Sequence, residues 1–237
     1  MKQLMNKKKI TLITGTSRGI GKFLVNYYLA KDHIVIGCSR NPSEIVNSNY
    51  FHFELDVSDE IKVKQIFSFI RKEFGRLDVL INNAGIASMN HSVLTPTSTA
   101  KKILETNVIG TFLFSREAFK IMKTMKFGRI INFATFAVPF KLEGEAIYAA
   151  SKAAVITLTE ILCREYADYN ITVNAVAPPA VKTDLIKGVP DDKLNGLIRR
   201  QAIHRYGEPS EVANVIDFLI DEKSDLISGQ IIYLGGI

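Results

Sequence analysis

The chain has 237 residues, of which 47% are hydrophobic and 23% are charged, and its formal net charge is +6. Such a chain can bury a sizeable core without disulfides or metals, so its composition excludes a scaffold that depends on either. The positive charge is compatible with an anionic ligand, but the lysines are dispersed and form no basic block, and no nucleic-acid recognition motif is found.

The cysteines and histidines indicate neither a disulfide nor a metal site. Cys38 and Cys163 lie far apart without a CxxC pattern, which predicts buried thiols in a reduced, cytoplasmic protein. The four histidines show no metal-ligand spacing. The first apolar run, ITLI, is too short for a signal peptide, and no stretch approaches about 20 apolar residues, so no membrane span is expected.

Seven short apolar runs alternate with segments of helical periodicity. The runs are ITLIT (10–14), HIVIGCS (33–39), YFHFELDV (50–57), LDVLINNA (77–84), GRIINFAT (128–135), ITVNAVAP (171–178) and QIIYLGG (230–236). Runs rich in Ile and Val that end in polar residues or glycine are typical of strands buried on both faces of a parallel sheet. The alternation predicts an α/β fold, with one doubly wound parallel sheet of about seven strands in a single domain spanning residues 1–237.

The first predicted strand runs into TGTSRGIG (14–21), which then opens a helix. Gly15 lets the chain turn off the strand, while Gly19 and Gly21 let the backbone approach a pyrophosphate and let the helix pack on the strand. The N–H groups at the start of the helix can then bind phosphate. The pattern lies between a strand and a helix, which is the context that nucleotide binding requires.

The end of the second predicted strand indicates which nucleotide binds. An acidic residue there would accept hydrogen bonds from the adenosine ribose and select NAD, but the chain has Ser39 and Arg40. Arg40, together with Arg18 of the glycine loop, can instead pair with a 2′-phosphate, because a guanidinium suits phosphate geometry. We therefore expect NADP(H) as cofactor, with NAD less favoured.

The spacing T-G-x-x-x-G-x-G resembles that of the short-chain dehydrogenase/reductase family, and the resemblance extends along nearly the whole chain. The matching motifs are NNAG (82–85), TNVIGTF (106–112), Tyr148 and Lys152 as YxxxK, VNAVAPP (173–179), GEPSEVA (207–213) and SGQIIYLGG (228–236). Their joint order and spacing are far more specific than any single motif. The resemblance implies a Rossmann-type sheet and a nicotinamide cofactor.

The resemblance also implies a set of cofactor-binding residues. They are Gly15, Thr16, Ser17, Arg18, Gly19, Ile20, Gly21, Ser39, Arg40, Asp56, Val57, Asn83, Ala84, Gly85, Tyr148, Lys152, Pro178, Val181 and Thr183. Asp56, which follows the third strand, is expected to meet the adenine amino group. Asn83 and Gly85 are expected to line the cofactor cleft.

Tyr148 and Lys152 lie one helical turn apart, so their side chains share a helix face. A tyrosine with its ordinary pKa of about 10 is a poor base at neutral pH, and nearby positive charge lowers that pKa. We expect Tyr148 to protonate the alkoxide in ketone reduction and to remove the hydroxyl proton in alcohol oxidation. The resemblance implies that Lys152 holds the nicotinamide ribose and that Asn107 anchors a water linked to Lys152.

Two residues depart from the family pattern. The family's substrate-binding serine, 13 residues before the tyrosine, is replaced by Thr135. Its hydroxyl can still donate to a carbonyl, while its methyl group, with Phe136, Val138 and Phe140, should narrow the pocket. Pro179 stands where the family commonly has glycine, which should stiffen the loop at the nicotinamide.

Residues 179–228 form the longest stretch without strand character. Such an excursion directly after a strand predicts a substrate lid at about 184–205, with a surface helical insertion as the alternative. The charges of this segment are mixed, and Lys187, Lys193, Arg199, Arg200 and His204 stand against Asp184, Asp191 and Asp192. They leave two interpretations open, an anionic substrate and a solvated charged helix.

The leading hypothesis is an NADP-dependent oxidoreductase acting on a ketone or secondary alcohol, with an anionic or sugar-like substrate. Within the family the chain resembles 3-oxoacyl-carrier-protein reductases and sugar or polyol dehydrogenases. Arg129 is available for a carrier protein, but Tyr169-Asn170 replaces a basic residue and glycine often found there. A non-catalytic nucleotide-sensing scaffold is the alternative from another class. The apolar helix that follows Tyr148 predicts a homodimer or homotetramer.

Overall fold

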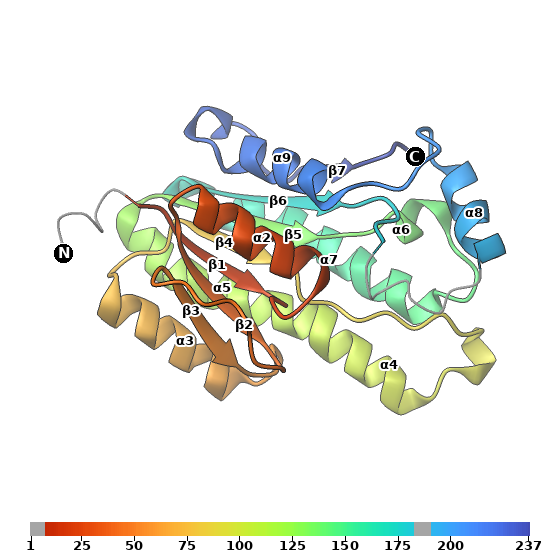
Figure 1. The fold of residues 1–237 in the computed structure, drawn as a ribbon, viewed down its shortest axis with the longest axis horizontal. Helices are drawn as coiled ribbons and strands as arrows, with labels where there is room; N and C mark the ends of the chain where they lie inside the picture. Colours follow the sequence, from red (N-terminus) through yellow and green to blue (C-terminus); the bar gives the residue numbers. More distant parts are fainter. Residues whose placement is uncertain (1–7, 183–190) are drawn as a thin grey trace.

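The computed structural model describes residues 8–182 and 191–237 (Figure 1). Within them, seven strands form one sheet in the order β3-β2-β1-β4-β5-β6-β7, and all pairings are parallel. The strands are β1 (Ile10–Thr14), β2 (Ile34–Ser39), β3 (Tyr50–Glu54), β4 (Val79–Asn82), β5 (Gly128–Phe133), β6 (Ile171–Ala177) and β7 (Ile231–Tyr233). The predicted doubly wound fold is confirmed. Five of the seven strands end one to three residues before the predicted ranges do.

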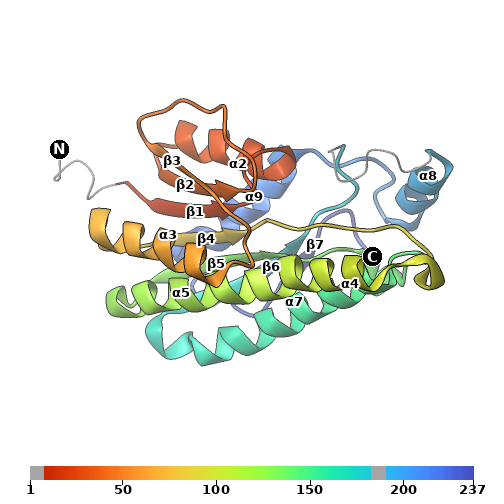
Figure 2. The ribbon, with the colours of Figure 1, turned by 90° about the horizontal axis from the view of Figure 1, so that it is seen from below.

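Helices cover both faces of the sheet, which makes three layers (Figure 2). On one face lie α2 (Gly19–Ala30) and α9 (Pro209–Ile220), and on the other lie α3 (Glu60–Glu73), α5 (Gly110–Met125) and α7 (Ala146–Glu165). Because successive side chains of a strand point to opposite faces, each strand contributes to both cores. This explains why most of the predicted strands are rich in apolar residues on both faces instead of alternating strictly between apolar and polar ones.

The remaining helical segments connect these layers. They are η1 (Ser92–Leu94), α4 (Thr97–Leu104), η2 (Glu105–Ile109), α6 (Ala137–Phe140), η3 (Ala167–Tyr169), α8 (Asp191–Arg200) and η5 (Glu222–Ser224). The π-helical turn η2 joins α4 to α5 without a break in the helical backbone. Such a turn inside a longer helix often marks a functional residue, and Asn107 lies in it.

Parallel strands place all their carboxyl ends at one edge of the sheet, where ligands bind in folds of this kind. The glycine loop after β1 and the segments after β4, β5 and β6 therefore meet at this edge. The residues predicted for cofactor and catalysis follow these same strands. The fold thus brings together motifs that are more than 100 residues apart in the sequence.

Helix α7 is more apolar than a surface helix needs to be. Over 18 residues its mean hydropathy is 1.4, and its length and composition would also suit a membrane span, although one such helix is weak evidence. Here α7 packs against β6, and only 33% of that window is buried. From the sequence we expected no apolar stretch of this length, and we therefore underestimated the length and hydropathy of α7.

Candidate functional site

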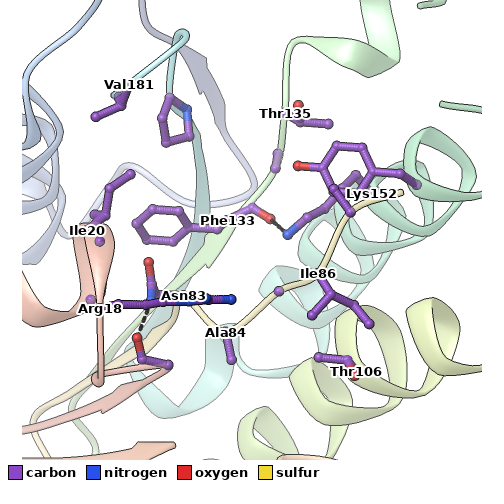
Figure 3. A pocket seen from close by; sticks show the side chains of 18 of the residues that line it. Arg18, Ile20, Asn83, Ala84, Ile86, Thr106, Phe133, Thr135, Lys152 and Val181 are labelled. Atoms are coloured by element: carbon purple, nitrogen blue, oxygen red, sulfur yellow. Dashed lines mark hydrogen bonds between the residues drawn. The ribbon is translucent and has the colours of Figure 1, made fainter. Parts of the chain in front are cut away.

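A cavity of about 330 Å³ lies at the carboxyl edge of the sheet. Its lining includes Gly15, Ser17, Arg18, Gly19, Ile20, Gly21, Ser39, Arg40, Asp56, Val57, Asn83, Ala84, Gly85, Thr135, Tyr148, Lys152, Pro178 and Val181. In Figure 3, Arg18, Ile20 and Asn83 lie on one side of Phe133, and Thr135 and Lys152 lie on the other. The predicted nucleotide and catalytic residues therefore form two ends of one cavity.

The glycine loop has the conformation that a phosphate cradle requires. Gly15 and Gly19 have φ values of 75° and 56°, a region that side chains rarely adopt. A Cβ on Gly21 would lie 2.1 Å from the carbonyl oxygen of Gly15, so only glycine fits. Helix α2 begins at Gly19 without a side-chain cap, which leaves its first N–H groups for an anion. These features fit a dinucleotide pyrophosphate.

Asn83 holds this loop in place. Its Nδ2 donates hydrogen bonds to the carbonyl oxygens of Thr14 at 2.8 Å and Gly15 at 3.2 Å. The N–H of Ala84 donates to the Thr14 hydroxyl at 2.9 Å. The segment after β4 thus lines the cavity and also fixes the turn after β1.

At the end of the cavity that is predicted to hold adenosine, two exposed arginines, Arg18 and Arg40, line the wall. Neither guanidinium forms an ion pair with any residue in 8–182 or 191–237. The Ser39 hydroxyl donates to the carbonyl of Asn41 at 2.7 Å, and His52 Nε2 lies 3.0 Å from the same oxygen. These contacts hold the segment that carries Arg40 beside the glycine loop.

Two predicted cofactor residues have other partners. Thr16 is fully buried and does not line the cavity; its hydroxyl oxygen accepts a hydrogen bond from Tyr50 at 3.2 Å. Asp56 lines the cavity, but its carboxylate accepts from Lys102 at 2.7 Å and from the Ser58 hydroxyl at 2.7 Å. Burial would raise the pKa of Asp56, but these hydrogen bonds outweigh it and lower that pKa to about 2. Contact with adenine stays a prediction.

At the opposite end, Lys152 is 5% exposed and its Nζ donates to the backbone carbonyl of Phe133 at 2.7 Å (Figure 3). Burial lowers the pKa of Lys152 to about 8. The contact joins helix α7 to the end of β5, and Thr135 lies two residues beyond that end. Three groups predicted for catalysis, Thr135, Tyr148 and Lys152, thus line the same end of the cavity.

Tyr148 differs from the expectation in its acidity. We expected the charge of Lys152 to lower the pKa of Tyr148. Instead burial raises this pKa to about 12, with a hydrogen bond from Thr135 acting in the opposite direction and the charge of Glu145 adding to the rise. Desolvation disfavours the phenolate more than the nearby groups stabilise it. The phenol is therefore fully protonated at neutral pH in the free protein.

Asn107 lies behind the cavity wall and does not line it. It is fully buried, and its Nδ2 donates to the carbonyl of Ile86 and to the Ser151 hydroxyl, both at 2.9 Å. Its Oδ1 accepts from the N–H of Ile86 at 2.9 Å. A Cβ on Gly85 would lie 3.4 Å from both Asn107 Oδ1 and Lys152 Nζ. Asn107 thus supports the wall beside Lys152, and its role in anchoring a water stays a prediction.

The loop after β6 accommodates Pro179 because two glycines, Gly207 and Gly235, lie beside the proline ring and have no side chain to clash with it. A Cβ on Gly207 would lie 2.3 Å from Pro179 Cγ, and one on Gly235 would lie 3.3 Å from Pro179 Cβ. Pro178 and Val181 line the cavity as predicted. Thr183 lies outside the described residues, as does the start of the predicted lid.

The substrate end is mainly apolar. Phe136 lines it as expected, together with Leu194 and Leu197 from α8, whereas Val138 and Phe140 do not. The exposed basic residues Arg199, Arg200 and His204 also do not line it. Other lining residues that sequence reasoning did not assign are Asn41, Leu55, Ile86, Ala87, Met89, Thr106, Phe133, Ala134 and Ala180. These residues are sequence neighbours of the recognised motifs, and that proximity to the motifs is the signal from which they could have been predicted.

Glu145 is a lining residue of a different kind, because it is a carboxyl group that is only 5% exposed. Burial raises its pKa from an ordinary 4.5 to about 7. Its position three residues before Tyr148 is the sequence signal that could have found it.

We expect Glu145→Gln to stabilise the free protein at pH 8 but hardly at pH 5. Because the folded-state pKa is raised, the wild type loses stability as pH rises from about 4.5 through 7, where the buried carboxyl must ionise. At about 1.4 kcal/mol for each pKa unit, the gain is about 3 kcal/mol at pH 8 and about 1 kcal/mol or less at pH 5. Urea unfolding at both pH values measures it, with the exposed Glu143→Gln as control. Equal gains at both pH values would contradict the burial of an ionised group.

Comparisons with known proteins agree with the geometry. A family model described as short chain dehydrogenase matches residues 9–194. The 3-oxoacyl-[acyl-carrier-protein] reductase FabG of Salmonella typhimurium is 33% identical over 234 residues, which cover 96% of each chain. The solved structure of ElxO with NADP bound has a TM-score of 0.88 at 33% identity and covers 96% of this chain and 97% of that chain. The aldohexose dehydrogenase of Thermoplasma acidophilum, in ligand-free form, has a TM-score of 0.89 at 28% identity and covers 97% of this chain and 93% of that chain.

Proposed function

This chain belongs to the short chain dehydrogenase family and is an NAD(P)-dependent oxidoreductase acting on CH–OH groups; we propose that its cofactor is NADP(H) and that Tyr148 is its acid–base group. The observation that carries the proposal is the arrangement of the cavity. One end holds the glycine loop with two arginines, and the other holds Tyr148, Lys152 and Thr135. A small carbonyl or alcohol is the substrate class of such an enzyme.

In this proposal each catalytic side chain has one task, and NADP(H) supplies or accepts the hydride when bound. Thr135 accepts a hydrogen bond from the N–H of Ala137 at 3.2 Å, and its own proton, which donates to Tyr148 in the free protein, turns to the substrate oxygen when substrate binds. Tyr148 gives its proton to that oxygen during reduction, and its raised pKa keeps the proton in place until then. Lys152, held by Phe133, binds the nicotinamide ribose.

The preference for NADP(H) is supported by Arg18 and Arg40. Both line the adenosine end, and no acidic residue stands at the end of β2 to bind the ribose hydroxyls. A guanidinium binds a 2′-phosphate through paired hydrogen bonds. ElxO, with NADP bound in its solved structure, is 33% identical to this chain.

A 3-oxoacyl-carrier-protein reductase is the second candidate, favoured by the 33% identity to FabG. The position of Arg129 disfavours this second candidate. The sequence leaves Arg129 available to a carrier protein, but it is only 1% exposed, and its guanidinium donates to the carbonyl of Gly128 at 3.0 Å. It also lies at the start of β5, which is the opposite edge of the sheet from the cavity. A buried arginine cannot form the basic patch that an acidic carrier protein would need. A small polar substrate fits better.

We also propose a homodimer or homotetramer, a cytoplasmic location and a lid at about 184–205 in the single domain. The association is supported by exposed apolar side chains on α5, α7 and η2, which include Phe112, Ile161 and Ile109. Two free cysteines support a reducing compartment. The lid is supported by Leu194 and Leu197, which line the cavity from α8.

Thr135→Val is expected to lower kcat/KM for ketone reduction at least 10-fold, because valine keeps the shape but has no proton to donate to the carbonyl. Thr135→Ser, the control, should keep turnover and improve kcat/KM for bulky ketones relative to small ones, since it removes only the methyl group. Steady-state rates of NADPH oxidation measure both. Unchanged turnover in Thr135→Val would remove Thr135 from the mechanism.

The proposed function itself is tested by NADPH oxidation, followed by absorbance, with a panel of ketones. Turnover of at least one ketone that depends on Tyr148 supports it. Tight NADPH binding without turnover across a broad panel would favour the non-catalytic nucleotide-sensing scaffold.

A further inference from the structure

We propose that Glu145 is a substrate-binding residue and that it selects a ketone carrying a hydroxyl group on the carbon next to the reacting carbonyl. The inference rests on the proposed function and adds the substrate class to it. It starts from the one carboxyl group among the described residues that line the substrate end of the cavity.

The position of Glu145 brings it to the reacting group. It immediately precedes α7, whose first turn carries Tyr148 three residues later, and residues three apart lie on the same face of a helix. Both residues line the cavity with Thr135, and Glu145 contributes to the electrostatic surroundings of the Tyr148 phenol. A substrate whose carbonyl reaches Thr135 and Tyr148 therefore has its neighbouring carbon close to Glu145.

The carboxyl of Glu145 has no partner within the described part of the chain. Glu145 occupies the position before α7 where a side chain often caps the helix, but it forms no capping hydrogen bond. No hydrogen bond or ion pair joins its side chain to residues 8–182 or 191–237. Its carboxyl oxygens are not among the described side-chain atoms that are both fully buried and unpartnered, so they are accessible from the cavity. A bound substrate would cover them, and a polar group that is buried without a partner is costly. A hydrogen-bond donor on the substrate would satisfy it.

The neighbours of Glu145 decide which donor fits. A carboxylate or phosphate on the substrate would be repelled by Glu145, so the anionic substrate that the lid charges left open is disfavoured. An ammonium group would be repelled by Lys152, which lines the same end, and would lose its hydration against the apolar Phe136 and Leu194. A hydroxyl is neutral and donates one hydrogen bond, which suits a single carboxyl in an apolar wall.

The test is a set of four-carbon substrates that differ at one position. Wild type is assayed with NADPH and 2-butanone, 1-hydroxy-2-butanone, 1-amino-2-butanone and 2-oxobutyrate. We expect kcat/KM for the hydroxy ketone to exceed that for 2-butanone by roughly 10- to 100-fold, mainly through KM, which is the effect of one hydrogen bond to a charged group.

Glu145→Ala should reduce this ratio to below about 3, and the ratio is read within each variant so that a change in overall activity does not affect it. Glu145→Gln should retain part of the preference, because its amide oxygen still accepts a hydrogen bond. The exposed Glu143→Gln serves as the matched control in the same loop, and NADPH binding by each variant verifies that it is folded.

The outcomes separate this inference from the proposed function. If wild type reduces none of the ketones although it binds NADPH, the proposed function fails. If wild type reduces 2-butanone but Glu145→Ala keeps the hydroxy-ketone ratio, the inference alone fails. A preference for the amino ketone or for 2-oxobutyrate would also overturn it.

Discussion

Replacing Tyr148 with phenylalanine is expected to lower kcat for ketone reduction by roughly 100- to 10,000-fold, the usual effect of losing a general acid. The variant removes one hydroxyl from a side chain that is 9% exposed, so the packing of α7 on the sheet should stay intact. The Kd for NADPH should remain within threefold of wild type, because the glycine loop and both arginines are unchanged.

A matched control for this change is Tyr169→Phe, since Tyr169 lies in η3 at the far end of α7 and does not line the cavity. It should leave kcat unchanged. Stopped-flow single turnovers distinguish the chemical step from product release in both variants. If Tyr148→Phe kept a tenth or more of the wild-type rate of the chemical step, another group would have to supply the proton.

Replacing Arg40 with aspartate is expected to reverse the cofactor preference. Wild type should use NADPH at least 10-fold better than NADH in kcat/KM, because a guanidinium can pair with the 2′-phosphate. In Arg40→Asp the new carboxylate would repel that phosphate and accept hydrogen bonds from the free ribose hydroxyls. The ratio of the two kcat/KM values should change by roughly 100-fold or more, the effect of losing one charged pair and gaining repulsion.

The control for this charge reversal is Arg71→Asp, an exposed arginine on α3 that does not line the cavity. It changes the net charge equally and should leave the preference in place. A wild type that used NADH as well as NADPH would contradict the role of Arg18 and Arg40. Loss of activity with both cofactors in Arg40→Asp would show that Arg40 supports the loop rather than selecting the phosphate.

Regular patterns made the fold predictable from the sequence. The run at 10–14 coincides with β1, and each other predicted strand overlaps an observed one, because strands buried on both faces leave continuous apolar runs. The glycine loop and the Tyr148–Lys152 pair were predictable for a related reason. Their chemistry depends on local spacing, and local spacing is visible in the sequence.

Long-range packing decided what the sequence could not predict. The burial of Thr16 under Tyr50 and of Arg129 at the start of β5 depends on strands that pair across the fold. The pairing of Asp56 with Lys102 joins residues 46 positions apart. The raised pKa of Tyr148 follows from desolvation, which no spacing between two residues reveals.

The substrate end was the least predictable part for the same reason. The sequence indicated basic side chains in the lid, but Arg199 and Arg200 are exposed and do not line the cavity, whereas the buried Glu145 does. A carboxyl residue three positions before Tyr148 cannot be assigned to the substrate end from the sequence alone, because the sequence does not show that its side chain is buried. Its burial beside Tyr148 supports a hydroxylated ketone and disfavours the anionic substrate, which was one of the two interpretations that the sequence left open.

The most direct test of hydride transfer by this chain uses NADPH deuterated on the transferred position of the nicotinamide ring. After incubation with 1-hydroxy-2-butanone and with 2-butanone, mass spectrometry locates deuterium in the alcohol products. We expect deuterium on the carbinol carbon with wild type, and at most a hundredth of that yield with Tyr148→Phe in the same time. Products without deuterium, or equal yields from the two proteins, would contradict an NADP-dependent oxidoreductase that works through Tyr148.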